Sequence, residues 1–200
     1  NRYLGMILIK QHRYDEATRC LETILQIAQA LGEGYQINVA YIQAIWGMLL
    51  ARQGKWTDGE EKLKASLSAR KNLQASPDTF ETMVWLGELC EAKGDVQTAL
   101  NWYTLSLEMK WAGRLNFVCE ALAGLVRVKH AQGDYAAIPP LLAEAEQLAQ
   151  QYEYNDHLAS LRLTQGMTTD VIGLNGQTSA SLPSVQSSQS AVIGFFKQAM

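Results

Sequence analysis

Four short turn sequences recur along this chain of 200 residues at nearly constant intervals. They occupy residues 12–17, 54–59, 94–99 and 133–138. Measured at the third residue of each turn, the successive intervals are 42, 40 and 39 residues. A period of this length indicates structural repeats that stack on their neighbours, because a single repeat cannot bury its own apolar face.

The segments between the turns have the apolar spacing of amphipathic helices, with apolar residues three and four positions apart. We therefore expect helical hairpins in which one helix ends at each turn and the next begins directly after it. Pro139 and Pro140 place the start of the eighth helix near Ile138, because proline is tolerated only in the first turn of a helix. The predicted helices are 1–11, 14–31, 37–53, 56–71, 78–93, 96–111, 114–132, 135–152 and 155–167.

Small and large residues also recur at fixed distances from the turns. Small residues at a helix crossing allow two backbones to approach closely, and large residues fill the space between hairpins. The small positions are Gly5, Gly47 and Gly87 before the turns and Ala17, Gly59 and Ala99 after them, with Leu21, Leu63 and Tyr103 at the large position. The fourth repeat departs from this pattern, since Val126 and Ile138 replace its small residues.

This arrangement resembles the tetratricopeptide repeat over residues 1–168, as four hairpins and one further helix. The resemblance implies an all-α fold, a right-handed superhelix (solenoid) of antiparallel helical hairpins. The period near 40 exceeds the standard repeat of about 34 residues. The chain is therefore similar to the long-helix variety in the sensor domain of signal-transduction ATPases of the maltose-regulon-activator type. That resemblance implies a module that binds an inducer or a protein partner.

In tetratricopeptide folds the first helix of each hairpin lines the concave face, which implies a partner-binding groove here. Glu81, Glu88 and Glu91 share one helical stripe. They form either a solvated acidic face or a strip that attracts cations or basic peptides, unless Arg127 and His130 pair with them from the adjacent helix. The predicted groove residues are Tyr41, Met48, Arg52, Glu81, Val84, Glu88, Glu91, Glu120, Arg127 and His130.

Charge and composition exclude several classes of partner. Seventeen basic against twenty acidic residues give a net charge of −3, which argues against a nucleic-acid-binding surface. No apolar run approaches the roughly 18 residues that a membrane-spanning helix needs. The chain starts with Asn1 inside a helical pattern, and we interpret it as a fragment of a longer protein.

The residues that carry chemistry show no recognisable catalytic or metal-binding pattern. The histidines are scattered at positions 12, 130 and 157, so we expect no metal site and no cofactor. The three cysteines are expected to be reduced and buried, as in a cytoplasmic protein. No phosphate-binding GxxxxGK[ST] sequence is present, and no Cys/His or Ser/His/Asp arrangement has a recognisable context.

The composition changes after residue 168. Residues 169–190 are rich in Ser and Gln and are expected to form a linker or tail, whereas 191–200 is predicted to be a short apolar helix. This helix is interpreted as a cap, the start of a further module, or a tethered peptide that docks on the repeats.

The sequence therefore predicts a non-enzymatic scaffold or sensor module of a larger regulatory protein. Its partner is expected to be a protein or peptide, or a small inducer, held by the concave face of the repeats. The alternative is a structural module for homo-oligomerisation, through the open end of the solenoid or through residues 191–200.

Overall fold

The computed structural model describes residues 2–72, 79–109, 115–158, 161–162 and 164–166. These residues form helices and turns, with no strand among them, which confirms the all-α prediction. None of the described helices is both long enough and apolar enough to cross a membrane. The chain divides into two compact units, and the boundary lies between Leu89 and Cys90, inside a helix.

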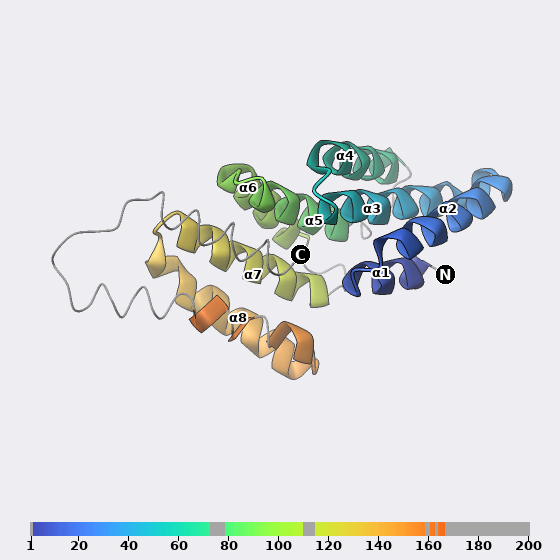
Figure 1. Ribbon diagram of the computed structural model, residues 1–200. Coiled ribbons are helices and arrows are strands. Elements are labelled where there is room, and N and C mark those ends of the chain that lie inside the picture. The colour runs from blue at the N-terminus through green and yellow to red at the C-terminus, as the bar shows by residue number, and fades with distance from the viewer. Residues whose placement is uncertain (1, 73–78, 110–114, 159–160, 163, 167–200) are drawn as a thin grey trace. The chain divides into compact units, whose positions relative to one another are not determined.

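The helices follow the predicted order (Figure 1). Unit 1 contains α1 (Arg2–Lys10), α2 (Tyr14–Ala30), the 3-10 turn η1 (Glu33–Tyr35), α3 (Gln36–Arg52), α4 (Trp56–Asn72) and the first part of α5 (Thr79–Ala92). Unit 2 contains the rest of α5, α6 (Val96–Leu107), α7 (Leu115–Ala131), the 3-10 turn η4 (Tyr135–Ala137) and α8 (Ile138–Gln151).

Most helix ends lie within two residues of the predicted ones. Helix α8 begins at Ile138, as its two prolines require, and the residues before it form a 3-10 turn. Helix α6 ends at Leu107 rather than at 111. The predicted ninth helix is helical at 155–158, 161–162 and 164–166. The predictions for 169–190 and 191–200 lie outside the described residues.

One backbone geometry closes all four turns. The second residue after each first helix has a left-handed backbone, with φ of 59° at His12, 77° at Gly54, 80° at Gly94 and 75° at Gly133. In the second turn the N–H of Gly54 donates to the Ala51 carbonyl at 3.0 Å, and the N–H of Lys55 donates to the Leu50 carbonyl at 2.9 Å. The other three turns repeat this pair of bonds, which is the Schellman motif. The repeated turn sequence therefore encodes a repeated helix end.

The crossing of α3 and α4 confirms the role predicted for its small residues. A Cβ atom on Gly47 would lie 2.9 Å from the carbonyl oxygen of Gly59, and one on Gly59 would lie 2.8 Å from that of Gly47. In the first hairpin, a Cβ on Gly5 would lie 2.8 Å from the side chain of Leu21. Any larger residue at Gly47 or Gly59 would force the two backbones apart.

The close approach between α6 and α7 in unit 2 uses a different glycine. Val126 and Ile138, which replace the small residues of the pattern, are both buried. Gly124 instead lies against the ring of Tyr103, and a Cβ on Gly124 would lie 2.3 Å from a ring carbon. The large tyrosine of α6 is thus accommodated by a glycine two residues before the expected small position.

Candidate functional site

Three of the six predicted groove residues of unit 1 lie inside the protein. The Tyr41 hydroxyl donates a hydrogen bond to the Glu81 carboxylate, and both residues are buried. The guanidinium of buried Arg70 lies 4.5 Å from the centre of the Tyr41 ring. Val84 is fully buried as well. The prediction that Tyr41, Glu81 and Val84 face an open groove is therefore corrected, because these positions pack between helices.

Three predicted residues of unit 1 remain accessible. Arg52 on α3 forms an ion pair with Glu88 on α5, with 3.5 Å between Nη2 and Oε2, and both side chains are partly exposed. Met48, one turn before Arg52, is half-buried. These residues are the part of the predicted groove that a partner could contact in unit 1.

Three of the charged residues predicted in unit 2, Glu91, Arg127 and Glu120, form polar contacts within the protein. Buried Glu91 accepts hydrogen bonds from Arg127, at 2.7 Å from Nε and 3.0 Å from Nη2, and from the Tyr103 hydroxyl at 2.8 Å. The suggested pairing of Arg127 with a carboxylate is thereby confirmed. Glu120 lies 3.2 Å from Nε2 of His157. Glu91 and Arg127 therefore form a buried pair and not part of an open groove.

His130 does not pair with a carboxylate in the described structure. Its ring packs edge-on against Tyr135, with 5.6 Å between the ring centres. Its Nε2 atom is buried and has no hydrogen-bond partner in the described part of the protein. This burial lowers the pKa of His130 below the ordinary value of 6.5.

Glu81, Glu88 and Glu91 consequently do not form one exposed acidic face. Two of the three are buried, and all three make polar contacts with side chains from neighbouring helices. The three residues do share the predicted stripe of α5, but neighbouring helices bury Glu81 and Glu91 and leave only Glu88 partly exposed. Burial of a carboxylate costs stability unless it is paired, so these contacts are required by the packing.

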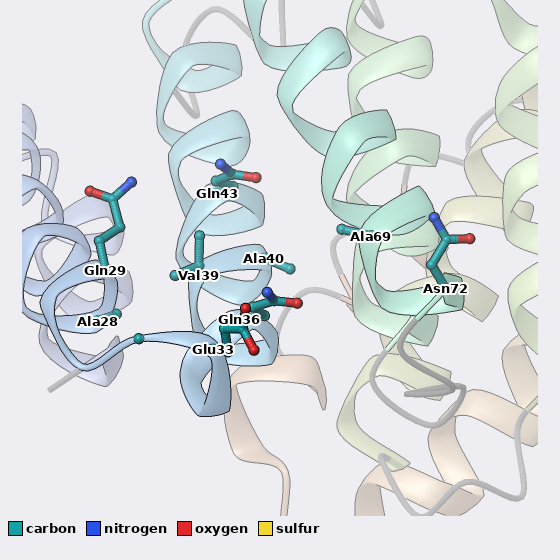
Figure 2. Close-up of a pocket in the computed structure, with 10 residues that line it drawn as sticks. Ala28, Gln29, Glu33, Gln36, Val39, Ala40, Gln43, Ala69 and Asn72 are labelled. Atoms are coloured by element: carbon teal, nitrogen blue, oxygen red, sulfur yellow. The ribbon is translucent and has the colours of Figure 1, made fainter.

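An open pocket of about 570 Å³ lies elsewhere in unit 1, at the ends of α2 and α4 and the first half of α3 (Figure 2). Its most prominent lining groups are four carboxamides and one carboxylate. These are Gln29, Gln36, Gln43, Asn72 and Glu33. We refer to this site as the carboxamide pocket. It lies on the side of α3 opposite to Tyr41, because Gln36 and Gln43 are roughly 140–160° around the helix from that residue.

The polar side chains of the carboxamide pocket have no polar partner among the described residues. Within the described part of the chain, none of these five side chains forms a hydrogen bond or an ion pair. Gln43 is half-buried and the other four are exposed. Their hydrogen-bonding capacity is therefore directed to solvent or to a ligand.

Sequence reasoning did not identify this pocket. Gln36 and Gln43 are seven residues apart on one stripe of α3, which is the same spacing that drew attention to Glu81 and Glu88. This spacing was the feature of the sequence that could have identified the α3 side of the pocket. Gln29 and Asn72 come from two other helices, so no spacing along the chain associates them with α3.

Unit 2 has a second pocket, of about 750 Å³, beside α6, α7 and α8. Its lining is mainly apolar and includes Leu100, Leu105 and Leu141. Lys129 also lines it, but its Nζ lies 2.8 Å from the Asp134 carboxylate. Asn101, Thr104 and Glu108 line it as well, and Asn101 accepts a hydrogen bond from Gln97. Among the described residues, Thr104 and Glu108 make no side-chain hydrogen bond or ion pair, so this pocket offers two such groups against five in the carboxamide pocket.

The described residues contain no group of three or more His, Cys, Asp or Glu side chains that could hold a metal ion. Burial raises the pKa of the Cys119 thiol to about 11, with a smaller contribution from the adjacent Glu120 carboxylate. The thiol therefore stays protonated near neutral pH. Because the thiolate is the nucleophilic form of cysteine, Cys119 is a poor nucleophile at this pH.

No protein-family model and no curated protein matches this chain. Its function is therefore inferred from the pockets and the polar contacts of the two units.

Proposed function

We propose that this chain is a non-enzymatic binding module that holds a protein or peptide partner, or a small inducer, in the carboxamide pocket. One observation carries the proposal: five polar side chains surround a pocket of about 570 Å³ and make no hydrogen bond or ion pair within the described protein. This volume is within the range of roughly 300–1,000 Å³ that is typical of ligand sites. Carboxamides bind by hydrogen bonds and do not titrate, which favours binding over acid–base chemistry.

The regulatory setting is part of the proposal and rests on the resemblance of the repeats. We propose that the hairpins form a tetratricopeptide-like right-handed superhelix within a larger cytoplasmic regulatory protein. The repeated turn geometry supports the repeat assignment, and the cysteines of the described residues form no disulfide. Small-angle X-ray scattering of the full chain tests the superhelix, which predicts an elongated particle, whereas a compact one would contradict it.

Selection from a displayed library of random peptides tests the binding function. We expect binders to the full chain that lose affinity for Ala69→Phe, because a phenyl ring at this pocket-lining position on α4 fills the pocket. Ala143→Phe is the matched control, since Ala143 is an exposed alanine on α8 that does not line the pocket. Binders that are equally tight to both variants, or no binders, would contradict the proposal.

Self-association is a second candidate function, favoured by apolar side chains on the surface of the first hairpin. These include Tyr3, Leu4 and Ile7 on α1 and Ile27 on α2, with exposed fractions of 52%, 47%, 51% and 55%. A second copy of the chain would bury such residues. Light scattering over a concentration series tests this function. It predicts a dimer that Ile7→Glu dissociates, and a monomer at every concentration would contradict it.

A further inference from the structure

We infer that the carboxamide pocket recognises the main chain of an extended, uncharged peptide segment of a partner protein. This inference rests on the proposed binding function and specifies the class of ligand. It follows from four features of the pocket: the chemistry of its polar groups, their spacing, the size of its wall residues and its charge.

The polar groups match a peptide backbone. A carboxamide offers an oxygen acceptor and an NH₂ donor, and each peptide group likewise offers one C=O acceptor and one N–H donor. A Gln or Asn side chain can therefore accept from the N–H and donate to the C=O of one extended residue, without reading the side chain of the ligand. In Figure 2, Gln36 and Gln43 on α3 lie between Gln29 on α2 and Asn72 on α4.

The spacing of the two α3 carboxamides suits an extended chain. Gln36 and Gln43 are seven residues apart, and seven residues of α-helix rise by about 10.5 Å. An extended peptide rises by about 3.3 Å per residue, so the same distance spans roughly three of its residues. The two side chains can thus address peptide groups three residues apart in a ligand that runs along α3.

The walls of the pocket leave room for side chains of the ligand. Ala28, Ala40 and Ala69 come from α2, α3 and α4, and each contributes only a methyl group. Val39 adds a further apolar surface of modest size. Small apolar and hydroxyl side chains of a ligand would fit against these walls.

The charge of the pocket disfavours anionic ligands. Glu33 is the charged residue of its lining, and no Lys or Arg lies there to pair with phosphate or with an acidic side chain. The lining also lacks aromatic rings on which a nucleic-acid base could stack. Main-chain recognition by carboxamides needs no charge on the ligand, and the carboxylate of Glu33 disfavours acidic side chains while it accommodates at most one Lys or Arg.

The test compares synthetic peptide pools with the full chain, using neutral, acidic and basic pools of equal length. We expect the neutral pool to bind most tightly. Within the neutral pool, N-methylation of the central peptide groups should weaken binding of the best peptide. The modification removes main-chain N–H donors of the peptide and leaves the protein unchanged. Gln36→Leu and Gln43→Leu should each weaken binding roughly two- to tenfold, the value of one hydrogen bond.

Gln150→Leu on α8 is the matched control and should leave the affinity unchanged, because Gln150 is an exposed glutamine outside the pocket. Preference for the acidic or the basic pool, or affinity that N-methylation and both Gln→Leu variants leave unchanged, would overturn the inference. In that case pocket-dependent binding, measured with Ala69→Phe, would still support the proposed function. Peptides that bind Ala69→Phe as tightly as the native chain would contradict both.

Discussion

The hydroxyl of Tyr41 donates a hydrogen bond to the carboxylate of Glu81, a residue 40 positions further along the chain. Each residue lies fifteen positions before the third residue of its turn, Trp56 or Val96, so the two occupy equivalent places in successive repeats. Equivalent positions of neighbouring first helices are thus in contact within unit 1. The side chains that sequence analysis placed in a groove are there part of the packing between repeats.

Tyr41→Phe should lower the free energy of unfolding by about 1–3 kcal/mol, because it removes the donor from a buried carboxylate. Tyr35→Phe is the matched control, since Tyr35 is 41% exposed, and it should have little effect. Urea unfolding followed by circular dichroism measures both. Equal stability of the native chain and Tyr41→Phe would show that the contact contributes little.

Gly124→Ala should destabilise unit 2 by roughly 1–3 kcal/mol, because the new methyl group would overlap the Tyr103 ring. The same substitution should cost much less in a Tyr103→Leu background, which places leucine where the other hairpins have Leu21, Leu63 and Leu142. A double-mutant cycle of unfolding free energies measures this coupling. A coupling near zero would mean that the glycine is not required by the ring.

His12→Gly should stabilise the first hairpin by about 0.5–1 kcal/mol, because His12 has φ of 59° where the other turns have glycine. The variant also loses the exposed 2.9 Å hydrogen bond between His12 and Tyr14, which reduces the gain. Glu22→Gly, at an exposed position in the middle of α2, is the control and should destabilise by about 1 kcal/mol. A fall in melting temperature for His12→Gly would contradict the turn assignment.

Stability should depend on His130 below neutral pH. Burial lowers the pKa of His130 in the folded state, so below about 6.5 the unfolded chain binds a proton more readily than the folded one. The stability present above pH 6.5 is therefore lost as the pH falls towards the folded pKa. Unfolding free energies from about pH 8 to about pH 5 should fall more steeply for the native chain than for His130→Gln. Parallel curves would contradict this role.

The features that could be predicted from the sequence are those that depend on neighbouring residues. The helix ends at Gly54 and Gly133 and the contact of Gly47 with Gly59 follow from residue types within one hairpin. The fate of Glu81 could not be predicted in this way, because it depends on which side chains of α3 and α4 face α5.

The carboxamide pocket illustrates the same limit of local patterns. Gln36 and Gln43 were recognisable as a pair on one helix, whereas Gln29 and Asn72 reach the pocket only through the packing of α2 and α4 beside α3. Gly124 is a comparable case in unit 2. Gly124 on α7 lies at a close contact with α6 because Tyr103, and not leucine, occupies the large position of the preceding hairpin.

The central claim is that the carboxamide pocket binds a ligand through side chains that have no polar partner among the described residues. Nuclear magnetic resonance of the side-chain NH₂ groups tests it most directly, during titration of the full chain with the tightest uncharged peptide. The resonances of Gln36 and Gln43 should shift, and that of Gln150 should not. Unmoved carboxamide signals, with the largest shifts at Met48 and Arg52, would contradict the claim and place the partner in the groove on the opposite side of α3.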